Sequence, residues 1–176
     1  MRELADADRI RRFMRALAAE ADAEARVYLI GGATAVLMGW RATTIDVDIK
    51  IVPEREPLLR AIPRLKESLR VNVEFASPEQ FIPPLPGWEE RSPFIAKEGK
   101  LSFHHYDFYA QALAKVERSH RQDLEDVGAM LQRGLVERER LLECFRQIEP
   151  ELYRYPALDP GTFRRSLEEI LDTERR

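Results

Sequence analysis

The chain has 176 residues, of which 44% are hydrophobic and 34% are charged, and its formal net charge is −3. These values are typical of a soluble globular protein and exclude a disordered chain. The small negative charge argues against stable DNA binding, because proteins that coat nucleic acid need a cationic surface. The longest uncharged apolar run, residues 27–40, is interrupted by glycines and too short to span a bilayer, so we expect no membrane partner. Since the single cysteine, Cys144, excludes an internal disulfide, we expect a cytoplasmic protein.

The first part of the chain alternates helical and strand patterns. Apolar residues recur at helical spacing over residues 5–25, and helix formers fill residues 33–38 directly after a glycine pair. Strands are expected at residues 27–30, 45–52 and 71–75, followed by a small hairpin over residues 94–103. Residues 54–69 have a helical period, although Pro63 is expected to kink or split that helix because proline lacks the amide proton.

After Asp107 the pattern is helical to the end, with helices expected over residues 108–119, 122–133, 137–148 and 162–174. Strands followed by a run of helices indicate the α+β class. We therefore predict a mixed sheet with flanking helices in residues 1–106, and a C-terminal helical bundle in residues 107–176. The helical region is expected to pack on the core, so that the chain forms a single compact unit.

Two carboxylates stand on one face of a predicted strand. Because side chains alternate along a strand, Asp46 and Asp48 point to the same side, away from the apolar Val47 and Ile49. Adjacent like charges repel unless a cation lies between them, and Mg²⁺ prefers carboxylate oxygens together with water and phosphate oxygens. Glu74 of the next predicted strand supplies a third carboxylate if the two strands are neighbours. By themselves these residues are equally compatible with a solvated strand face.

A glycine pair precedes the carboxylates. Gly31 and Gly32 end one strand and open a helix, so that backbone amides can approach a phosphate group closely. The polar segment from Arg41 to Thr44 then returns the chain to the Asp strand, where Thr44 either bonds to the ligand or closes the turn.

Two segments carry a resemblance to a known family: residues 29–35, Leu-Ile-Gly-Gly-Ala-Thr-Ala, and residues 44–48, Thr-Ile-Asp-Val-Asp. Together they resemble the signature of the minimal nucleotidyltransferase superfamily, whose fold is of the DNA polymerase beta type. Over about residues 27–131 the chain is similar to a bacterial group that includes AbiEii-like toxins and DUF6036-type proteins. The resemblance implies that Gly31 and Gly32 contact nucleotide phosphates and that Asp46 and Asp48 bind metal.

The helical half carries a second part of the resemblance. Toxin-like relatives have a Lys-x-x-Arg or Lys-x-x-Lys pattern followed by Asp-x-x-Asp, which corresponds to Lys115, Arg118, Asp123 and Asp126. The resemblance implies that Lys115 contacts nucleotide phosphate with help from Arg118, and that the two aspartates orient these cations or the acceptor. An ordinary ionic network that ties two helices together is the alternative interpretation.

Two other groups of residues have weaker functional interpretations. The stretch from Glu54 to Arg70 has an excess of basic residues, which indicates either an RNA contact or a solvated helix face. His104 and His105 are consecutive on a predicted strand, so they face opposite ways and cannot bind one metal ion together.

The sequence and the resemblance predict a transferase that moves a nucleoside monophosphate from an NTP to an acceptor hydroxyl and releases pyrophosphate. Mg²⁺ or Mn²⁺ is the expected cofactor, with Asp46 and Asp48 as ligands and Glu74 as the general base or the third ligand. A tRNA end, a protein side chain and a small molecule remain open as acceptors. The alternative is a non-catalytic nucleotide-binding or interaction protein, for instance one half of a toxin–antitoxin pair with an antitoxin as its partner.

Overall fold

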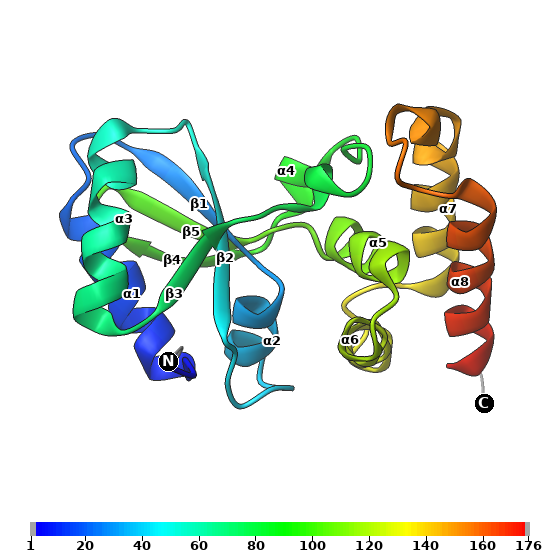
Figure 1. Ribbon diagram of the computed structural model, residues 1–176, viewed down its shortest axis with the longest axis horizontal. Coiled ribbons are helices and arrows are strands. Elements are labelled where there is room, and N and C mark those ends of the chain that lie inside the picture. Colours follow the sequence, from blue (N-terminus) through cyan, green and yellow to red (C-terminus); the bar gives the residue numbers. More distant parts are fainter. Residues whose placement is uncertain (1–2, 175–176) are drawn as a thin grey trace. The chain divides into compact units, whose positions relative to one another are not determined.

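The computed structural model describes residues 3–174 and has the α+β architecture that the sequence predicts. The chain divides into two compact units, each of them made of two segments. The first unit comprises Met1–Ser77 and Ser92–Tyr106, and the second comprises Pro78–Arg91 and Asp107–Arg176. All strands belong to the first unit (Figure 1).

A five-stranded mixed sheet of order β3-β2-β1-β5-β4 forms the centre of the first unit. Its strands are β1 (Ala25–Ile30), β2 (Asp46–Val52), β3 (Asn72–Phe75), β4 (Phe94–Glu98) and β5 (Leu101–His105). The central strand β1 pairs antiparallel with β2 and parallel with β5, while β3 lies parallel to β2 at one edge. The predicted hairpin is confirmed as the antiparallel pair β4–β5.

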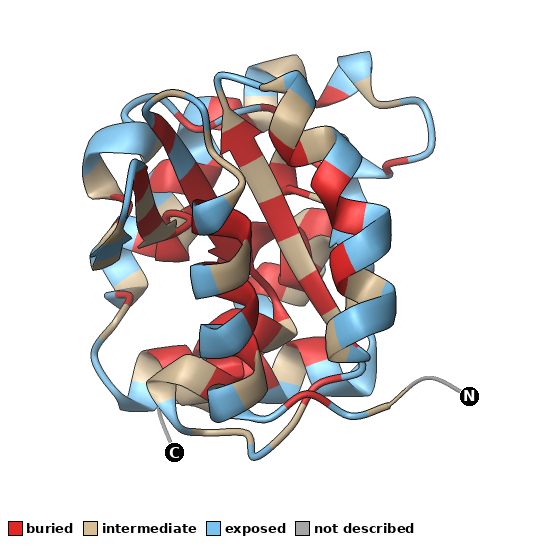
Figure 2. Ribbon diagram, turned by 90° about the vertical axis from the view of Figure 1, so that its left-hand side faces the viewer, coloured by how far each residue is buried: buried red, intermediate tan, exposed pale blue. Residues whose placement is uncertain are grey.

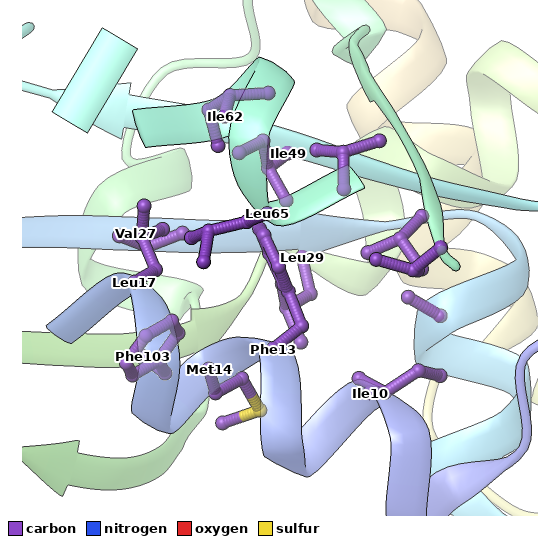
Figure 3. Packing of buried hydrophobic residues seen from close by; sticks show 14 of the residues in the cluster. Ile10, Phe13, Met14, Leu17, Val27, Leu29, Ile49, Ile62, Leu65 and Phe103 are labelled. Atoms are coloured by element: carbon purple, nitrogen blue, oxygen red, sulfur yellow. The ribbon is translucent and has the colours of Figure 1, made fainter. Parts of the chain in front are cut away.

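The helices of the first unit are α1 (Ala7–Ala19), α2 (Gly32–Met38) and α3 (Glu56–Leu69). Side chains of α1, α3 and the strands form one hydrophobic cluster, in which Phe13, Leu17 and Leu29 are fully buried (Figure 3). Buried and half-buried residues alternate along β2, because successive side chains point to opposite faces of the sheet (Figure 2). On β2, one face therefore contributes Val47, Ile49 and Ile51 to the core, and the other carries Asp46, Asp48 and Lys50.

Pro63 does not split α3, which runs without a break from Glu56 to Leu69. The proline costs about 3 kcal/mol through its missing amide and its clash with the preceding turn. The opposite side of the helix buries Leu58, Ile62 and Leu65, and each buried side chain of this size contributes about 1.5–3 kcal/mol. The apolar face of the helix thus outweighs the break that proline alone would cause.

The second unit is helical, and its long helices agree with the predicted ranges to within about two residues. It contains a 3-10 turn (η1, Pro78–Gln80), a short helix α4 (Trp88–Arg91), and then α5 (Phe108–Arg118), α6 (Arg121–Gln132), α7 (Arg138–Ile148), η2 (Glu149–Arg154) and α8 (Pro160–Thr173). Hydrogen bonds join the inserted segment to the rest of the unit. Arg91 pairs with Asp107 at 2.7 Å, and the Tyr155 hydroxyl donates to the Glu79 carbonyl at 2.8 Å. Over residues 3–174, none of the helices has the length and apolar character needed to cross a membrane.

Candidate functional site

The strand β2 places Asp46 and Asp48 on the polar face of the sheet, where both are half-buried. The neighbouring strand β3 runs parallel, and its register sets Asn72 opposite Asp46 and Glu74 opposite Asp48. Side chains directly opposite one another in a sheet share a face. The condition under which Glu74 would join the aspartates is therefore met, and three carboxylates stand on one face of two adjacent strands.

Asn72 links two of these carboxylates, a role that sequence reasoning missed. Its side-chain amide donates one hydrogen bond to Oδ1 of Asp46 and another to Oε1 of Glu74, the latter at 3.1 Å. An amide group has two N–H donors, so one Asn can hold two acceptors at a fixed separation. The signal in the sequence was the position of Asn72, two residues before Glu74 and hence on the same face of the strand.

The glycine pair lies directly beside this face. Ile30, the last residue of β1, is opposite Asp48, and the chain then turns at Gly31 with a φ of +66°. A Cβ atom on Gly31 would lie 3.1 Å from Oδ2 of Asp48, and one on Gly32 would lie only 2.0 Å from the Thr44 hydroxyl oxygen. The turn thus needs glycine twice, once for its backbone angle and once for the close approach of Thr44.

The segment before β2 completes the site around the glycines. Thr44 is buried, and its hydroxyl donates to the Asp46 carbonyl at 3.0 Å, which fixes the start of the Asp strand. Arg41 also comes close, since its Nη1 lies 3.0 Å from the position of a Cβ on Gly32. A guanidinium beside the glycine pair was not expected from the sequence, because only the folded loop brings residues nine positions apart together.

The donor set fits a hard divalent cation. Asp46 and Asp48 offer carboxylate oxygens on one face, and Mg²⁺ commonly takes one or two carboxylates while water and substrate phosphate complete its shell. Within residues 3–174, no group of three or more His, Cys, Asp and Glu side chains is arranged to hold a metal ion. Glu74 is exposed and bonded to Asn72. The chain's own contribution to a metal site is therefore centred on the aspartate pair, and the role of Glu74 as a third ligand stays a prediction.

The predicted residues of the helical half form an ionic network inside the second unit. The Lys115 ammonium lies 2.7 Å from Asp126 and 3.8 Å from Asp123, while Arg118 contacts Asp123 at 2.6 Å. Lys115, Asp123 and Asp126 are at most 5% exposed. These contacts tie α5 to α6, as the alternative interpretation of this motif holds. That Lys115 and Arg118 bind nucleotide phosphate, and that Asp123 and Asp126 orient them, stays a prediction.

The two histidines of β5 have unlike surroundings. The Nδ1 atom of His105 lies 3.0 Å from the Thr34 hydroxyl, and burial lowers the pKa of His105 to about 4. Burial also lowers the pKa of His104, against the opposing hydrogen bond to the Ser92 carbonyl. Because burial disfavours the charged imidazolium, His105 is neutral near pH 7 and packs as part of the protein interior.

Comparison with known protein families identifies the class of protein to which the chain belongs. A family model described as a nucleotidyltransferase of unknown function (DUF6036) matches residues 7–156. The match covers most of the chain, so the chain belongs to this family, as the resemblance in its sequence implied. Comparisons with curated proteins and with solved structures gave no match.

Proposed function

We propose that the protein transfers a nucleoside monophosphate from an NTP to an acceptor hydroxyl, with Asp46 and Asp48 holding Mg²⁺ or Mn²⁺. The observation that carries the proposal is the close grouping of two aspartates and a glycine turn. Both aspartates stand on one face of β2, and the Asp48 carboxylate approaches within 3.1 Å of the Cβ position on Gly31. Because Gly31 has no Cβ, its backbone lies close to the Asp48 carboxylate, where a triphosphate bound to the metal would be held.

When bound, the divalent ion supplies positive charge to the phosphate oxygens on which negative charge develops. Asp46 and Asp48 fix its position, and Thr44 holds the backbone of Asp46 through the hydrogen bond to its carbonyl. Glu74 accepts the proton of the acceptor hydroxyl, and Asn72 orients the Glu74 carboxylate for this step. The hydroxyl oxygen then bonds to the α-phosphorus while the bond to pyrophosphate breaks.

The test is the thermal stability of the full chain with each of the four NTPs, with and without Mg²⁺. A ligand that binds only the folded state raises the melting temperature, by an amount that grows with its concentration over Kd. We expect a metal-dependent rise with at least one NTP, and we expect the double variant Asp46→Asn, Asp48→Asn to lose it. The matched control is Asp8→Asn with Asp22→Asn, which removes two exposed carboxylates of the same unit.

The control variant is expected to keep the metal-dependent rise, since neither residue lies on the polar face of the sheet. If no NTP stabilises the wild-type chain in the presence of metal, the transferase proposal fails. A rise in melting temperature without release of pyrophosphate in any acceptor assay assigns the non-catalytic alternative, a nucleotide-binding partner such as a component of a toxin–antitoxin pair.

A further inference from the structure

A groove lies at the edge of the sheet next to the candidate site. It has a volume of about 760 Å³ and is lined by residues of α3 and β3. Apolar side chains form much of its surface: Leu59, Ile62, Val73 and Phe75, of which Phe75 is 45% exposed. Asn72 lines the same groove and donates hydrogen bonds to Asp46 and Glu74. The strand β3 therefore borders the groove and also carries part of the carboxylate face.

The strand that borders the groove determines what kind of molecule fits it. β3 is an edge strand, and β2 is its single neighbour in the sheet of the described chain. An edge strand presents backbone N–H and C=O groups on its outer side, and an extended polypeptide is the ligand that pairs with such a row. We propose that an extended polypeptide segment binds beside β3 as an added strand, and that this segment is the nucleotidyl acceptor. The inference rests on the proposed function and names its acceptor class.

The alternation of side chains along a strand connects the groove with the reaction. On β3, Val73 points toward the core side while Asn72 and Glu74 share the face of the aspartates. An added strand follows the same alternation, so every second side chain enters the groove and the intervening ones lie on the carboxylate face. A residue opposite Glu74 would be about one strand spacing, roughly 4.8 Å, from β3 and about twice that distance from β2. A Ser, Thr or Tyr between two apolar residues therefore fits both surfaces.

The charges around the groove favour a polypeptide over RNA. The excess of basic residues on α3 is largely neutralised by ion pairs: Arg60 with Glu56, Arg64 with Glu20, and Arg70 with Glu3. The lining of the groove itself has two basic residues, Lys66 and Arg70, and two acidic ones, Glu67 and Glu3, and Glu3 also pairs with Arg9 at 2.9 Å. Binding of a polyanion depends on uncompensated cations, which release counterions from the phosphates. A groove with balanced charge and an apolar floor fits an uncharged, alternating peptide instead.

The reaction on such a segment is balanced without a further reagent. The side-chain oxygen of the peptide bonds to the α-phosphorus of the NTP, and the bond between that phosphorus and the bridging oxygen breaks. Pyrophosphate leaves with the bonding electrons, and the hydroxyl proton passes to Glu74. The product is a peptide that carries a nucleoside monophosphate in a phosphodiester linkage.

The experiment uses the full chain with Mg²⁺ and each NTP labelled at the α-phosphate. The acceptor probes are peptides of about eight residues, longer than a typical strand, in which valine alternates with Ser, Thr or Tyr. Matched peptides carry N-methyl groups on the backbone, which block strand pairing, and tRNA serves as the nucleic-acid probe. The variant Phe75→Glu places a charge in the groove, and Phe94→Glu is its control on the other edge strand, where Phe94 is 61% exposed.

We expect label in the unmethylated peptides at least about tenfold above the methylated ones, a factor equivalent to about 1.4 kcal/mol of lost pairing. Phe75→Glu should abolish this labelling and keep the NTP-dependent thermal shift, while Phe94→Glu should keep both. Label in tRNA but not in peptides overturns the inference, as does equal labelling of methylated peptides or unchanged labelling in Phe75→Glu. Absence of any labelled peptide while the NTP shift persists also overturns it.

Failure of the proposed function is recognised separately, by loss of the NTP shift in the wild-type chain. Fluorescence anisotropy of the same peptides without nucleotide then tests the groove alone. Binding that N-methylation and Phe75→Glu both remove supports a peptide site beside β3. Binding that neither change affects, or no binding, overturns that site.

Discussion

The variant Lys115→Met is expected to destabilise the helical unit by about 3 kcal/mol, the lower end of the range for removing one partner of a buried ion pair. Methionine keeps most of the length of the side chain and removes its charge. Asp126, 2% exposed and 2.7 Å from the ammonium, would then be a buried carboxylate without its cation. Asp123 keeps Arg118 at 2.6 Å, which limits the cost. The double variant Lys115→Met, Asp126→Leu should recover most of the loss, because it removes both charges.

Urea unfolding can follow this unit separately, because the chain has two tryptophans and they belong to different units. Trp88 lies in the helical unit and Trp40 in the sheet unit, so a Trp40→Phe background leaves one reporter in the unit of interest. The control is Arg121→Met on α6. Its partner Glu125 lies at 3.2 Å, but the side chains are 95% and 58% exposed. Exposed pairs of this kind contribute about 0.5 kcal/mol or less.

A loss of stability in Lys115→Met no greater than that in Arg121→Met would refute the reasoning. The buried ammonium would then not stabilise the fold, and a charge buried inside the unit would need a ligand as its explanation. In that outcome the predicted contact of Lys115 with nucleotide phosphate becomes the better account of the network, and the NTP thermal shift of the variant measures it.

Two further predictions concern the sheet unit. Gly32→Ala should lower the stability of this unit by about 1–3 kcal/mol, because the new Cβ would lie 2.0 Å from the Thr44 hydroxyl oxygen. Thermal unfolding measures this loss, and Gly32→Ala should cost less in a Thr44→Gly background, where that oxygen is absent. The pKa of His105, about 4 in the folded chain, is below its ordinary value of 6.5, so the unfolded chain binds the proton first as the pH falls. The free energy of unfolding is therefore highest above about pH 6.5. As the pH falls toward 4, it decreases by about 3 kcal/mol at most because of this residue. His105→Gln should flatten the dependence of urea stability on pH in this range, and an unchanged slope would contradict the assignment.

The parts of the site that follow from periodicity were predictable from the sequence. Alternation along a strand places Asp46 and Asp48 on one face of β2, and it places Asn72 and Glu74 on one face of β3. Neither result depends on the order of the strands in the sheet. The bridge made by Asn72 and the approach of Arg41 to the glycine turn were not predictable, because they depend on side-chain rotamers and on the path of a loop. The burial of Lys115 had a weak signal, since it lies within a run of small and apolar residues on α5.

The same division applies to the fold. Local patterns identified the strands and the long helices, because each buries an apolar face whose period can be read along the chain. The order of the strands could not be read in this way. β1 pairs in parallel with β5, so that Leu29 lies opposite His105, and no local pattern connects segments so far apart in sequence. Pro63 shows the opposite limit, since a local rule predicted a kink or a split, and burial of the neighbouring residues keeps α3 unsplit.

The interleaving of the two units sets the order in which they can form during synthesis. The chain leaves the sheet unit after Ser77, returns at Ser92 and leaves it again after Tyr106. One edge of the central strand β1 has no partner until the ribosome has produced β5, and β5 follows a segment that belongs to the other unit. In the completed chain Ile82 and Leu85 of that segment are 1% exposed, so a nascent chain that ends at Tyr106 carries them without the helices of their own unit. Until those helices are made, Ile82 and Leu85 are available to bind a chaperone or a fusion partner.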